Sequence, residues 1–189
     1  MRRSRRYDHQ PVLGAAIFLL LVTVLAAYAE SGPPCNDSLG SRLSLPETLQ
    51  ILALHNQTRA EVGVEPLAWS AELADYAQLW ADHLASTRCG MEHRPGSGKW
   101  QQLYGENLYI GTANFYDTSN AVMAWAKEKN NYRAGEVLQA ARAAAIGHYT
   151  QMVWHNTRKI GCAAGLCRGR LIVVCNYDPP GNFLRQKPY

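Results

Sequence analysis

The stretch of sequence that decides the fold is KIGCAAGLCRGRLIVVCNY, residues 159–177. Two apolar runs flank Arg168-Gly169, a pattern that predicts two antiparallel strands joined by a two-residue turn. Arg168 is the unusual part of this turn, because the position prefers Asn or Gly. With that turn, Cys162 opposes Cys175 at a non-hydrogen-bonded pair, where Cα atoms approach to about 4.5 Å. Because this separation suits a disulfide, the hairpin predicts a Cys162–Cys175 bond.

Three further cysteines bring the count to five. Cys167 lies five residues after Cys162, so its side chain points to the opposite face of the sheet. There we expect it to bond with Cys89, at the end of an expected helix. Cys35 stands outside this framework, as a free thiol or as the partner of a cysteine in another chain.

The N-terminus is predicted to be a signal peptide over residues 1–29. A basic segment precedes an apolar run of about 16 residues, which is shorter than the ~20 needed to span a bilayer. Ala27-Tyr28-Ala29 then supplies the small residues of a cleavage site before Glu30. An uncleaved membrane anchor is the alternative. Cleavage predicts a secreted protein, extracellular or periplasmic, in which cysteines are oxidised.

Composition and charge bound the remaining chain. Residues 30–45 are rich in Gly, Pro and Ser and predict a flexible arm, and residues 46–189 predict a single domain. The whole chain of 189 residues is 47% hydrophobic and 18% charged, so it can bury one core. Its formal net charge is +4. Four arginines before residue 10 account for this charge, and the near-neutral remainder predicts no nucleic-acid partner.

Local patterns predict helices at residues 46–62, 70–88 and 118–129, a strand at 107–110 and an alanine-rich helix at 136–145. His55 and Arg59 lie four residues apart on one face of the first helix. We expect them to tie that helix to a neighbouring element rather than to perform chemistry.

Four side chains carry the candidate chemistry: His93, Glu106, Glu128 and His148. Two imidazoles and two carboxylates suit a divalent-metal site or an acid–base group. Their separations in sequence do not show that they meet, so four unrelated surface residues remain the alternative. The sequence contains no Gly-x-Ser-x-Gly nucleophile elbow and no His-Glu-x-x-His zinc helix.

The same segments resemble the CAP superfamily, which comprises cysteine-rich secretory proteins, antigen five and plant pathogenesis-related group one proteins. The plant proteins resemble the chain most, and the resemblance extends from about residue 47 to the last residue. It rests on these motifs: Leu54-His55-Asn56-Gln57-Thr58-Arg59, Gly105-Glu106-Asn107-Leu108, Gly147-His148-Tyr149-Thr150-Gln151-Met152-Val153-Trp154, and Cys175-Asn176-Tyr177-Asp178-Pro179-Pro180-Gly181-Asn182.

The resemblance implies an α+β fold, an α-β-α sandwich with a central antiparallel sheet stabilised by disulfides. It implies that the four His and Glu side chains line one open cleft. In the family such a tetrad can bind a divalent cation, often zinc, so the implied cofactor is zinc or another divalent ion with His93 and His148 as ligands. The family also supports both disulfide pairs predicted above.

The sequence departs from the family in two places. The loop Glu92-His93-Arg94-Pro95 has arginine where the family usually has serine after the histidine. The additional disulfide of plant members is missing, because residues 136–147 contain no cysteine.

The resemblance implies a binding module for a sterol or another lipid, with a defence, antimicrobial or host-interaction role. We expect Phe115 and Tyr116 to form a wall of the lipid site, and the alternative is that both belong to the core. A membrane surface stays open as a further partner, and no oligomeric state is predicted. The alternative function is a divalent-metal-dependent hydrolase that uses the tetrad. A third possibility is that residues 179–189, which match a signalling peptide of plant members, are released.

Overall fold

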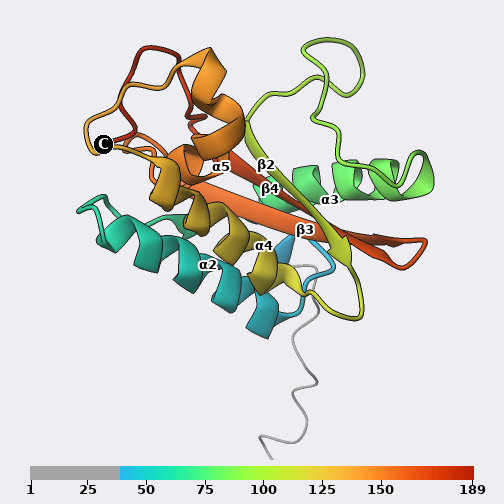
Figure 1. Ribbon diagram of the computed structural model, residues 1–189. Helices are drawn as coiled ribbons and strands as arrows, with labels where there is room; N and C mark the ends of the chain where they lie inside the picture. The colour runs from blue at the N-terminus through green and yellow to red at the C-terminus, as the bar shows by residue number, and fades with distance from the viewer. Residues whose placement is uncertain (1–38) are drawn as a thin grey trace, which may run out of the picture. The chain divides into compact units, whose positions relative to one another are not determined.

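The structure is a computed structural model that describes residues 39–189 (Figure 1). The predicted signal peptide, Cys35 and residues 30–38 of the predicted arm lie outside the described residues. Within residues 39–189, none of the helices has the length and apolar composition that crossing a membrane requires.

A four-stranded sheet with the order β1-β3-β4-β2 forms the middle layer. Its strands are β1 (Ala68–Trp69), β2 (Gly105–Thr112), β3 (Lys159–Cys167) and β4 (Arg170–Asp178). The short β1 runs parallel to β3, and the other pairs are antiparallel. The fold is thus of the α+β class that the family resemblance implied.

The β3–β4 hairpin has the predicted register. Cys162 pairs with Cys175, and the two are joined by a disulfide with Cα atoms 4.1 Å apart. Arg168 and Gly169 form the turn, and both have positive φ, 48° and 74°. These angles belong to the turn type that matches the right-handed twist of the strands. The predicted pairing is confirmed.

Three helices cover one face of the sheet: α2 (Leu45–Ala60), α4 (Thr118–Lys127) and α5 (Ala143–Met152) (Figure 1). Ser44 and Glu47 form a capping box at the start of α2, and Asp117 caps α4. The larger core cluster lies between these helices and the sheet, and its bulkiest members are Ile51, Trp125, Tyr149, Met152 and Tyr177.

The helix α3 (Ala71–Ser86) packs against the opposite face. Gly161 permits this close approach, because a Cβ atom there would lie 2.2 Å from the main-chain nitrogen of Ala74. The disulfide Cys89–Cys167 ties the end of this helix to the end of β3. Both predicted disulfides are therefore present, one within the hairpin and one between layers.

The expected helix at residues 136–145 is wrong over most of its length. A 3₁₀ turn, Ala140–Arg142, precedes α5, which begins only at Ala143. Leu138 instead pairs with the C-terminal tail: its N–H donates to the carbonyl of Gln186 at 2.9 Å, and its carbonyl accepts from Arg185 at 2.8 Å. These tertiary main-chain bonds override the helical preference of the segment.

Residues 39–44, the last part of the predicted flexible arm, pack on the domain. Leu43 is buried, and the carbonyl of Leu39 accepts a hydrogen bond from the indole of Trp69 at 3.0 Å. The side chain of Arg42 forms an ion pair with Asp82 on α3. This part of the arm is therefore held in place rather than free.

The C-terminal tail, residues 179–189, lies against α5 and the segments around it. The N–H of His155 donates to the carbonyl of Pro188 at 2.7 Å, in addition to the two bonds at Leu138. Thr150 donates to the side chain of Asn182 at 2.7 Å, and the hydroxyls of Tyr149 and Tyr189 are 3.3 Å apart. Main-chain and side-chain bonds thus hold the tail along its length.

Candidate functional site

Glu106 is the second residue of β2, and its carboxylate contacts His93 from the loop between α3 and β2. Nδ1 of His93 lies 2.8 Å from Oε1 of Glu106, which also accepts the main-chain N–H of Arg94 at 3.1 Å. The Glu106 side chain is fully buried, whereas that of His93 is 56% exposed. Because a carboxylate only accepts, neutral His93 carries its proton on Nδ1 and keeps the lone pair on Nε2.

Glu128 holds His148 in a similar way. It begins the 3₁₀ helix η2 (Glu128–Asn131) directly after α4, and its Oε1 lies 2.6 Å from Nδ1 of His148 on α5. Its Oε2 accepts the main-chain N–H groups of His148 and Tyr149 at 3.0 and 3.1 Å. The buried indole of Trp125 stacks on the imidazole of His148, with ring centroids 6.0 Å apart. The core therefore orients this imidazole.

Asn107 links the two pairs through the strand. It follows Glu106 in β2, and its Nδ2 donates to the carbonyl of His148 at 3.0 Å and to the hydroxyl of Tyr177 at 3.0 Å. In the sequence, the only signal for Asn107 is its place directly after Glu106 in the motif Gly105-Glu106-Asn107-Leu108. The side chain fixes α5 against β2, so it positions both halves of the site.

The four predicted side chains form two hydrogen-bonded pairs. In the part of the chain that the structure describes, no three His, Cys, Asp or Glu side chains are grouped so that they could hold a metal ion. The donors of each pair nevertheless suit a divalent cation, since histidine ligands usually donate their other ring N–H to a carboxylate. His93 and His148 would be the ligands through Nε2, and the two glutamates would orient them.

His93 also lines a cavity of about 430 Å³ formed by α3 and the loop after it. Trp80, His83 and Trp100 form an aromatic wall, with ring centroids 4.9 Å apart for Trp80 and His83 and 4.7 Å for His83 and Trp100. The other three members of the predicted tetrad do not line this cavity. The resemblance implied one cleft lined by all four side chains, whereas this cavity is lined by His93 alone among the four.

Arg94 lies beside Glu106 and is buried, with its side chain 3% exposed. Its Nε is 3.9 Å from Oε2 of Glu106, and its Nη2 donates to the carbonyl of Tyr76 at 2.6 Å. The guanidinium also lies over the Tyr76 ring, 3.7 Å from the centroid. Burial lowers the pKa of Arg94, and the nearby Tyr76 and Glu106 partly offset this effect. In the sequence, Arg94 stands out only as a departure from the family pattern.

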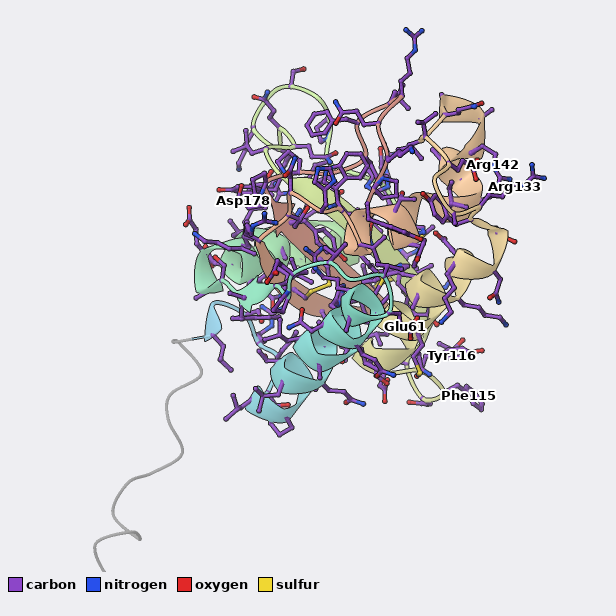
Figure 2. The ribbon with its side chains drawn as sticks, turned by 90° about the vertical axis from the view of Figure 1, so that its left-hand side faces the viewer. Glu61, Phe115, Tyr116, Arg133, Arg142 and Asp178 are labelled. Atoms are coloured by element: carbon purple, nitrogen blue, oxygen red, sulfur yellow. A yellow bond between two sulfur atoms is a disulfide. The ribbon has the colours of Figure 1, made fainter. Side chains whose placement is uncertain are left out.

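Phe115 and Tyr116 lie in the loop between β2 and α4, and their side chains are 81% and 47% exposed. Figure 2 shows the two side chains together at the outer end of this loop. The alternative that both belong to the core is therefore wrong. Tyr116 borders a cavity of about 560 Å³ between this loop, the start of α2 and the β3–β4 hairpin, which is lined further by Arg42, Leu43, Glu47, Leu166 and Leu171.

Helices on both faces of a short, mainly antiparallel sheet, closed by two disulfides, place the chain in the class of small disulfide-stabilised α-β-α sandwiches. The profile of one such family, CAP, described as the cysteine-rich secretory protein family, matches residues 52–177. The chain belongs to this family.

Named relatives and solved structures agree with this membership. The chain is 45% identical over 139 residues to pathogenesis-related protein 1C of Nicotiana tabacum, covering 73% of this chain and 78% of that protein. It is 38% identical over 176 residues to pathogenesis-related protein PR-1 of Medicago truncatula, covering 92% and 95%. The crystal structure of NaASP2 with Zn2+ superposes with a TM-score of 0.67 at 25% identity, covering 84% of this chain and 90% of that one.

Proposed function

We propose that this chain is a secreted, defence-related CAP protein that binds a sterol or another lipid through the loop of residues 111–117. The relatives named above are pathogenesis-related proteins, which supports the defence role. Two disulfides suit an oxidising location, extracellular or periplasmic.

The observation that carries the lipid proposal is the exposure of Tyr116, which lines this cavity, together with the exposed Phe115 next to it in the loop. Large exposed aromatic side chains at a cavity mouth favour an apolar ligand, because covering them removes apolar surface from water. The cavity volume of about 560 Å³ lies in the range of small-molecule sites. Its lining combines three leucines with the charged side chains of Arg42, Glu47 and Asp117, so it offers apolar surface together with polar groups that would orient a ligand.

The His–Glu pairs are a poorer place for a sterol. The carboxylate of Glu106 is fully buried and its Oε2 has no hydrogen-bond partner in the structure. An apolar ligand at these pairs would instead cover the exposed imidazole of His93, and removing a polar group from water without a hydrogen bond is unfavourable. We therefore assign the lipid and the histidines to separate places.

A binding assay with tritiated cholesterol on the secreted protein tests the assignment. Phe115→Ser combined with Tyr116→Ser should weaken binding at least about tenfold, because two apolar contacts are lost. Phe183→Ser with Leu184→Ser is the matched control, since these adjacent side chains are also exposed, at 49% and 55%. The control and His93→Ala should bind as the unchanged protein does. Loss of binding in His93→Ala, with the loop variant unaffected, would place the ligand at the histidines instead.

The paired histidines support a second proposal, weak binding of zinc or another divalent cation by His93 and His148. Each imidazole has a carboxylate on Nδ1, and NaASP2, a structural relative, has been crystallised with Zn2+. Calorimetry with zinc chloride tests this, and the double variant His93→Ala, His148→Ala should abolish the heat of binding. The same pairs support the alternative function, a metal-dependent hydrolase. That function predicts zinc-dependent peptide cleavage by the unchanged protein and no cleavage by the double variant.

A further inference from the structure

The buried carboxylate of Glu106 needs a compensating positive charge. Its side chain is 0% exposed, and an ionised carboxylate without compensation is costly in the protein interior. A metal ion held by His93 would supply that charge, but the protein would have to take it up from solution.

Arg94 supplies the charge permanently. Its guanidinium is 3.9 Å from Glu106, and arginine stays protonated at every physiological pH. The side chain has little freedom to leave. It donates to the Tyr76 carbonyl, lies over the Tyr76 ring, and is 5.2 and 5.5 Å from the ring centroids of Trp80 and Trp100. Among residues 39–189, neither Nε of Arg94 nor Oε2 of Glu106 has a hydrogen-bond partner, so the contact between them is an ion pair without a hydrogen bond.

The other half of the tetrad is different. Among the described residues, Glu128 forms an ion pair with His148 alone, and its side chain is 19% exposed. Within residues 39–189, no lysine or arginine lies within ion-pair distance of Glu128, whereas Arg94 lies at that distance from Glu106. The two His–Glu pairs therefore have the same hydrogen bond between imidazole and carboxylate, but in this part of the chain only the Glu106 pair has an arginine beside it.

We propose that Arg94 is a built-in cation that takes the electrostatic place of a metal ion beside Glu106. It lowers the affinity of the His93–Glu106 pair for divalent cations, so that His148, oriented by Glu128, is the stronger of the two metal ligands. A fixed positive charge repels an incoming dication, and it offsets the negative charge of the carboxylate that strengthens His93 as a ligand. The inference rests on the divalent-ion binding proposed above.

Calorimetry with zinc chloride on the full secreted protein tests the proposal. Arg94→Gln removes the charge and keeps a donor for the Tyr76 carbonyl, so zinc affinity should rise by about tenfold or more. Arg94→Lys keeps the charge and should stay close to the unchanged protein. Arg170→Gln is the matched control, because Arg170 is exposed and pairs with Thr112, six residues along β2 from Glu106. It changes the net charge equally and should leave zinc affinity unaltered.

A second comparison does not depend on how Arg94 variants fold. In the otherwise unchanged protein, His148→Ala should reduce zinc affinity more than His93→Ala does. Equal losses in these two variants, or a zinc affinity of Arg94→Gln that equals that of Arg94→Lys, would overturn the role of Arg94 while leaving metal binding in place. An absence of zinc binding in every variant would instead overturn the metal proposal itself.

Discussion

The hydroxyl of Tyr177 and Nε2 of His55 share a hydrogen bond of 2.9 Å in the core between α2 and β4. Nδ1 of His55 lies 2.8 Å from the carbonyl of Ile51 and must donate, because a carbonyl only accepts. Nε2 therefore accepts from Tyr177, whose oxygen in turn accepts from Asn107. This chain of bonds requires a neutral imidazole and continues through Asn107 to the main chain of His148.

We expect the stability of the protein to fall as His55 becomes protonated. Burial lowers the pKa of His55 from 6.5 to about 4, and the charge of Arg59 adds to this effect. Between these two values the unfolded chain binds the proton and the folded chain does not, so stability is complete above pH 6.5 and decreases toward pH 4. The loss attributable to this group is on the order of 3 kcal/mol.

Urea unfolding at pH 7 and pH 4 measures this loss. His55→Gln cannot ionise, so its stability should change less between the two pH values, even though it is less stable at pH 7. An equal pH-dependent loss in His55→Gln would show that other groups cause it.

A second prediction concerns the hairpin turn. Arg168 has φ of 48° and is exposed, and this backbone region is unfavourable for most side chains other than Asn, Asp and Gly. Arg168→Asn should therefore raise the free energy of unfolding by about 0.5–1 kcal/mol. The control is Arg170→Asn, which removes the same charge from a strand position. Thermal unfolding compares the stabilities of the two variants with that of the unchanged protein. Higher stability in both variants would show that removal of the charge, and not the turn conformation, is responsible.

The third prediction concerns the order in which the disulfides are reduced. Cys162 and Cys175 are completely buried, whereas Cys89 is 7% exposed and Cys167 is half-buried. Because thiol exchange requires access to a sulfur atom, mild dithiothreitol should reduce Cys89–Cys167 first. Alkylation followed by peptide mass spectrometry identifies the cysteines that are freed. Labelling of Cys162 and Cys175 before the other pair would contradict this expectation.

The features that could be predicted from the sequence depend on short-range rules. The position of Arg168-Gly169 sets the register of a two-residue hairpin, so the opposition of Cys162 and Cys175 follows by counting. His55 and Arg59 were expected to be structural. Arg59 is fully buried and donates to four main-chain carbonyls, of Glu65, Met152, Trp154 and Thr157.

The features that escaped prediction depend on contacts between distant segments. The helix expected at residues 136–145 is replaced by pairing of Leu138 with the tail, about fifty residues later in the chain. Propensity contains no information about such a partner. Similarly, the sequence showed that Arg94 was unusual, but only the folded loop places its guanidinium beside Glu106. The family resemblance singled out the four His and Glu residues, but it did not indicate that only one of the two His–Glu pairs has an arginine beside it.

Because hydrogen bonds hold residues 179–189 against the domain, cutting the chain before this tail would not by itself release the tail as a peptide. A protease that cuts before Pro179 would produce a nicked protein in two pieces, still joined through Leu138, His155 and Thr150. The amount of free peptide would then follow a dissociation equilibrium, with dilution and temperature as its controls. The nicked protein would migrate as one species in a native gel and as two in denaturant, so peptide release by this chain is as much a binding problem as a proteolytic one.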